Sequence, residues 1–172
     1  MTGSRGARLA IVSWAVGGVV LVLVDAIVRL LPKALEPLTV GPPDTTTLLA
    51  YLTAIVALAY TEGYRGFQQH FSPRVAARAL RLADESSPLL VVFAPLVAMG
   101  LLHATRRRLI SSWSLLVTIV GFVLIVRMLR QPWRGAVDAG VVVGLSWGTV
   151  ATLTHAVRAW RGRKLQVDAD FP

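Results

Sequence analysis

The chain of 172 residues contains no cysteine. Disulfides, thiolate metal sites, iron–sulfur clusters and covalently attached c-type haem are therefore excluded. Acidic residues are scarce as well, with 9 Asp and Glu against 18 Lys and Arg. The sequence also lacks a glycine-rich phosphate loop, a nucleophile elbow, an HExxH zinc motif and a dense carboxylate motif for Mg²⁺. These absences favour a non-enzymatic protein over an enzyme.

Apolar residues dominate what is present. They make up 55% of the chain, and the mean hydropathy is +0.62, which is far above the value for a soluble domain of this size. The apolar residues gather in five stretches, each near the length of about 20 residues that crosses a bilayer. These stretches are 9–31, 46–60, 88–103, 109–126 and 136–157. We predict an all-α polytopic membrane bundle with five hydrophobic helices, four or five of them true spans.

Prolines and capping residues divide the chain into one transmembrane domain, 1–164, and an acidic C-terminal tail, 165–172. The proline-rich segment 32–44 is expected to be a loop, and Asp44 or Thr45 to cap the next helix. Ser72 and Pro73 begin a short amphipathic helix that we place on the membrane surface. The expected helices are approximately 9–31, 45–64, 73–83 (interfacial), 88–105, 109–130 and 135–160.

The basic residues bear on two possible topologies, and an even distribution would also be explained by insertion in both orientations, which is rarer. If all five stretches span, each side of the membrane carries nine of the 18 Lys and Arg residues, which gives no preferred orientation. If the third stretch, which contains Pro95, enters and returns, both termini lie on the cytoplasmic side with thirteen basic residues against five. We favour five spans, because a proline in a spanning helix needs only a kink, whereas re-entrant backbone needs a protein-lined or wet cavity.

Small residues recur every fourth position along the last helix. Such stripes let helix backbones approach closely in lipid. The stripe comprises Ala136, Gly140, Gly144, Gly148, Thr152 and Ala156. A weaker stripe in the fourth apolar helix comprises Ser111, Ser114, Thr118 and Gly121. We expect these faces to pack within the chain or at a subunit interface.

Ionisable side chains inside apolar helices are costly, so each indicates a partner or a function. Asp25 precedes Arg29 by four residues, the favourable order for a pair within one helix. A second set repeats the pattern aromatic-Arg-Gly with an acid nearby, and would share one membrane level if all five stretches span. Its members are Glu62, Tyr64, Arg65, Trp133, Arg134 and Asp138. We predict that these residues form a polar or ligand site, with interfacial anchoring as the alternative.

Two histidines suggest a different class of protein. His103 ends the third hydrophobic helix, and His155 lies near the end of the fifth. Both lie on the same side of the membrane in either topology. Ligation of a b-type haem by two imidazoles between helices would need that arrangement. No other cofactor and no metal is expected.

Three functional hypotheses follow. The first is a small non-enzymatic accessory or self-associating subunit that packs through the glycine stripe and binds anionic lipid. The second is a small transporter, channel or hydrophobic-ligand binder that uses Glu62, Arg65, Arg134 and Asp138. The third is a haem b electron-transfer subunit or membrane enzyme. The expected partners are membrane lipids and a homo-oligomer or larger membrane complex, without nucleic acid, in a bacterial inner membrane.

Overall fold

The computed structural model describes residues 5–84, 87–162, 167, 169 and 171. Over this part of the chain the regular elements are all helices. They are α1 (Arg5–Thr39), α2 (Thr45–Leu58), the π-helix η1 (Ala59–Phe71), α3 (Ser72–Asp84), α4 (Pro88–Val92), α5 (Ala94–Ala98), α6 (Arg106–Arg127) and α7 (Trp133–Trp160). Among the described residues, four helices are long and apolar enough to cross a membrane: α1, the continuous α2–η1–α3 helix, α6 and α7. The predicted all-α membrane bundle is confirmed.

Helix α1 continues into the segment that was expected to be a loop. Pro32 and Pro37 lie inside it, and Pro37 lacks the N–H that would bond to the carbonyl of Lys33. The side-chain amide of Gln131 donates a hydrogen bond of 3.4 Å to that carbonyl instead. Prolines are tolerated in membrane helices when a neighbouring side chain satisfies the freed backbone group. The loop is therefore shorter than expected and covers only 40–44.

The second expected helix and the expected interfacial helix form one continuous helix of 40 residues. Asp44 caps its start, because the Asp44 carboxylate accepts the backbone N–H of Thr47 at 3.1 Å. The apolar face of α3, with Val75, Ala79 and Leu82, is buried in the core with α1 and α5. This differs from a helix lying on the membrane surface. An amphipathic pattern suits a protein core as well as an interface, so the pattern alone could not separate them.

The third apolar stretch forms no spanning helix. It breaks at Phe93 into α4 and α5, each of five residues. Pro95 cannot donate an N–H to the preceding turn, and Gly100, with a φ of 76°, ends the segment in a conformation that favours glycine. Helix α5 packs against α1 and α3, and Pro95 lies against Gly18. These contacts supply the protein-lined surroundings that interrupted backbone needs at membrane depth. Among the described residues four helices, not five, are long and apolar enough to span, so the favoured five-span arrangement is wrong.

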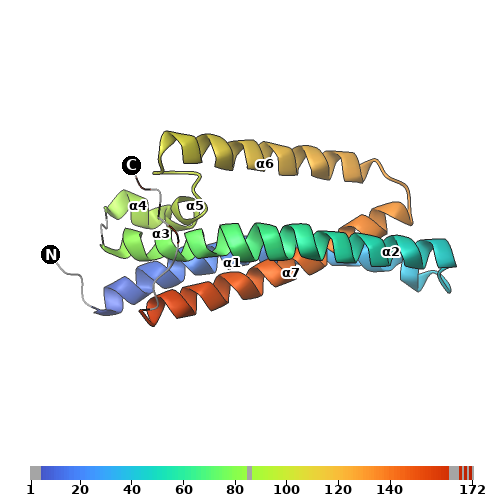
Figure 1. Ribbon diagram of the computed structural model, residues 1–172, viewed down its shortest axis with the longest axis horizontal. Helices are drawn as coiled ribbons and strands as arrows, with labels where there is room; N and C mark the ends of the chain where they lie inside the picture. Colours follow the sequence, from blue (N-terminus) through green and yellow to red (C-terminus); the bar gives the residue numbers. More distant parts are fainter. Residues whose placement is uncertain (1–4, 85–86, 163–166, 168, 170, 172) are drawn as a thin grey trace.

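Helices α1 and α7 and the α2–η1–α3 helix lie side by side, whereas α6 runs apart from them (Figure 1). The start of α1, the α4–α5 segment and the end of α7 lie at one end of the molecule, which we call the terminal end. The α1–α2 and α6–α7 links lie at the other, the distal end. Among the basic residues that the structure describes, those toward the distal end are the five expected for the re-entrant alternative: Arg29, Lys33, Arg127, Arg130 and Arg134.

Candidate functional site

The glycine stripe of α7 packs within the chain, against the α2–η1–α3 helix. A Cβ atom added at Gly140 would lie 2.6 Å from the carbonyl oxygen of Ala54, and one at Gly148 would lie 2.5 Å from the ring of Phe67. Further along, the hydroxyls of Thr152 and Ser72 are 2.9 Å apart. Because α2, η1 and α3 already occupy this face, the stripe is not open to a second molecule.

The middle of the long helix is a π-helix of 13 residues, η1. A π-helix bonds each N–H five residues back, is rare, and usually occurs as a single turn at functional sites. Two glycines let its wider backbone fit: a Cβ atom at Gly63 would lie 3.1 Å from the side chain of Trp147, and one at Gly66 would lie 3.3 Å from the carbonyl oxygen of Thr61. The 13-residue segment also carries the polar sequence that was singled out around Glu62.

Glu62 lies near the middle of the long α2–η1–α3 helix, where this helix packs against the middle of α7. It is half-buried, and a Cβ atom added at Gly144 on α7 would lie 3.3 Å from its Cβ and its Oε2 atoms. Glu62 makes no hydrogen bond and no ion pair with any residue that the structure describes. The central carboxyl of this site therefore has no cationic partner among those residues.

The rest of the predicted polar set lies elsewhere. Arg134 and Asp138 face each other within α7, with Nε and Oδ2 separated by 3.6 Å. Asp138 lies six residues before the glycine that contacts the Glu62 carboxyl, which is about 9 Å along the helix axis. Arg65, Tyr64 and Trp133 are exposed. The two aromatic-Arg-Gly patterns are therefore not brought together into one site.

The Asp25–Arg29 pair lies on the outer face of α1. Its Oδ2 and Nε atoms are 2.8 Å apart, and both side chains are more than half exposed. The pair neutralises its own charge within one helix, away from Glu62 on η1.

The two histidines have different surroundings. His103 follows α5 with a φ of 47°, and its ring contacts the ring of Phe171 with centroids 5.3 Å apart. His155 lies on α7, where it lines a groove opposite η1. His103 thus contacts an aromatic ring, whereas His155 lines the groove, and His103 is not among the residues that line it.

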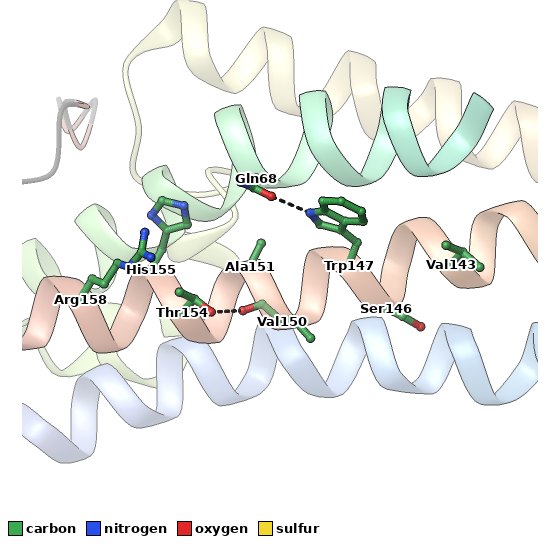
Figure 2. A pocket seen from close by; sticks show the side chains of 9 residues that line it. All are labelled: Gln68, Val143, Ser146, Trp147, Val150, Ala151, Thr154, His155 and Arg158. Carbon is green, nitrogen blue, oxygen red and sulfur yellow. Dashed lines mark hydrogen bonds between the residues drawn. The ribbon is translucent and has the colours of Figure 1, made fainter. Parts of the chain in front are cut away.

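That groove, of about 560 Å³, is a feature that the sequence reasoning missed. It runs along α7 from Val143 to Arg158, beside Gln68 of η1. The indole N–H of Trp147 donates a hydrogen bond of 2.7 Å to Oε1 of Gln68, and Trp147 and His155 project from α7 toward η1 (Figure 2). A glutamine in the middle of a long membrane helix was the available signal, because a polar amide in lipid requires a partner.

The described residues bring together a half-buried glutamate, Glu62, and a groove lined in part by polar side chains. They contain no group of three or more His, Asp or Glu side chains placed to hold a metal ion. A comparison of the chain with protein-family models, curated proteins and solved structures finds no match. The fold and the site together define the chain as a helical membrane protein whose function is inferred from its own geometry.

Proposed function

We propose that the protein is a small non-enzymatic subunit of the bacterial inner membrane that self-associates through α6 and holds anionic lipid at its terminal end. The observation that carries this proposal is the isolation of α6 from its own bundle. Its only buried residues are Ser112 and Val126, near its two ends. Only 11% of its apolar segment is buried, against 39% for α7. A second copy of the chain would supply the missing packing.

No helix that the structure describes lies against the small-residue stripe of α6. Ser111, Ser114 and Thr118 are exposed, and a Cβ atom added at Gly121 would meet nothing within 4 Å. The equivalent stripe of α7 is covered along its length by another helix. Because small residues drive close helix approach in lipid, the uncovered stripe supports association of α6 with a neighbouring α6. A two-fold axis would bring the same face of both copies together.

Two substitutions test this use of α6. Gly121→Leu fills the stripe, whereas Val123→Leu enlarges a side chain on the opposite side of the same helix. Single-molecule photobleaching in lipid vesicles counts the copies in each particle. We expect two or more copies for the wild type and for Val123→Leu, and single copies for Gly121→Leu. A wild-type protein that is monomeric, with α6 surrounded by lipid, would refute the proposal.

Anionic lipid is the second part of the proposal. Exposed arginines gather at the terminal end on two helices, where phosphate headgroups would lie. They are Arg106 and Arg107 at the start of α6, and Arg158 and Arg161 at the end of α7. Each basic residue near an anionic membrane surface contributes about 1 kcal/mol of attraction. The positive charge excess at this end also favours its placement on the cytoplasmic side.

A further inference from the structure

Glu62 differs from every other acidic residue that the structure describes. Asp25, Asp84 and Asp138 each lie within 3.6 Å of an arginine. Glu36 lies 3.6 Å from a lysine, and Asp44 accepts a backbone N–H as a helix cap. Glu62 alone has neither kind of partner within the described chain, and it lies at the greatest depth from the helix ends. A carboxyl group without such a partner is costly in a membrane and therefore indicates a functional role.

The surroundings of Glu62 favour a neutral carboxylic acid. It lies against Gly144 of α7, and Leu58 of α2 approaches the same glycine. The nearest titratable groups on α7 are Asp138 and His155, which lie six and eleven residues along the helix from Gly144, about 9 and 16 Å. On its own helix, Arg65, Tyr60, Tyr64 and His70 are exposed. An ionised carboxylate without a cation is strongly disfavoured in an apolar medium.

A proton suits this site better than a metal cation. Hard cations take several oxygen ligands at once, whereas the described residues offer no cluster of carboxylates or histidines there. A single carboxyl can hold a single proton without any further ligand. The chemical class of ligand that the geometry supports is therefore the proton.

The groove beside η1 runs toward the terminal end with Gln68, Thr154 and His155 along a mostly apolar lining. It begins at Val143, the sequence neighbour of the glycine that contacts Glu62, and ends at Arg158. The packing of α7 against the long helix is tight on both sides of Glu62, at Ala54 and Gly140 and at Phe67 and Gly148. Because the groove extends from Val143 toward the terminal end, water can approach from that end more readily than from the distal end.

We propose that Glu62 is a reversible proton-binding site that exchanges its proton with the terminal end through the Gln68–His155 groove. The proton-binding site is independent of the association through α6, because none of the residues that carry it lies on α6.

A hydrophobic carbodiimide tests for the protonated acid in the whole protein in lipid vesicles. The carboxylic proton passes to a carbodiimide nitrogen and the carboxyl oxygen adds to the central carbon, which gives an O-acylisourea that rearranges to a stable N-acylurea. We expect one adduct, located on Glu62 by peptide mass spectrometry and lost as the pH is raised. It should be absent from Glu62→Gln and retained in Asp138→Asn. A wild-type protein with no adduct on Glu62, or with labelling spread over the paired acids, would overturn the proposal.

Infrared spectroscopy gives a second readout that needs no reagent. The wild type should show the carbonyl band of an un-ionised acid, shifted in D₂O and missing from Glu62→Gln. Gln68→Leu and Thr154→Leu remove polar lining from the groove and should slow the deuterium shift, whereas Ser13→Leu on the exposed face of α1 should not. An absent band contradicts the protonated acid, and an unchanged exchange rate in the groove variants contradicts the route.

Discussion

Gly140→Ala is the sharpest test of the packing between α2 and α7. The added methyl carbon would lie 2.6 Å from the carbonyl oxygen of Ala54 and 2.7 Å from Cδ1 of Leu58. One of these neighbours is backbone, so the helices must separate. Overpacking of this kind costs about 1–3 kcal/mol, from which the better helix propensity of alanine subtracts about 1 kcal/mol. We therefore expect Gly140→Ala to lower the free energy of unfolding by between zero and about 2 kcal/mol.

Gly17→Ala is the matched control. Gly17 also lies inside a spanning helix, but a Cβ atom there would meet nothing within 4 Å. Only the propensity gain applies, so this variant should be stabilised by up to about 1 kcal/mol. Both variants can be compared with the wild type by titrating SDS into mixed micelles and following helicity by circular dichroism. If Gly140→Ala unfolds at the same SDS fraction as Gly17→Ala, the close contact between α2 and α7 is refuted.

Two further predictions concern the helix cap formed by Asp44 and the binding of anionic lipid. Hydrogen bonds from the side chain and backbone N–H of Thr47 lower the pKa of Asp44. The pKa of Asp44 in the folded state is thus below its pKa in the unfolded state. The cap therefore stabilises the fold fully at pH values above the unfolded-state pKa, and this stabilisation is lost as the pH falls through the folded-state pKa. The protection of the Thr47 amide from hydrogen exchange, measured relative to its intrinsic exchange rate at each pH, should fall in acid for the wild type but not for Asp44→Asn; an equal fall in both would contradict this. For the lipid, Arg107→Gln should lower the anionic lipid that co-purifies with the protein, whereas Arg130→Gln at the distal end should lower it less. Equal losses would remove the special role of the terminal end.

The sequence predicted the class of fold because apolar runs of bilayer length have few alternatives. It missed the continuation of α1, because Pro37 is tolerated only through Gln131, a residue 94 positions away whose contact no local pattern reveals. The break in the third stretch was predicted only as the less favoured alternative, since hydropathy does not register that Pro95 and Gly100 interrupt the helix. The uneven distribution of arginines in the four-span arrangement was the available signal.

The candidate site was predicted in part. Glu62 could be singled out because it is an acidic residue in an apolar helix. The stripe around Gly144 could be recognised from the spacing of its small residues. Their contact depends on the register between η1 and α7, which the sequence does not specify. The proposed grouping of Glu62 with Asp138 depended on five spans, and the return of the α4–α5 segment removes its basis. No role was predicted for Gln68 or Trp147, because the hydrogen bond between them joins two separate helices.

Disulfide cross-linking along α6 tests the association of two copies most directly, because the native chain has no cysteine. Single cysteines would be placed at Ser114, Thr118 and Gly121 on the stripe, and at Val120 and Val123 on the other side, and oxidised in membranes. The self-association through α6 predicts disulfide-linked dimers at the three stripe positions and monomers at the other two. Cross-linking that ignores this helical periodicity, or that fails at every stripe position, would contradict it.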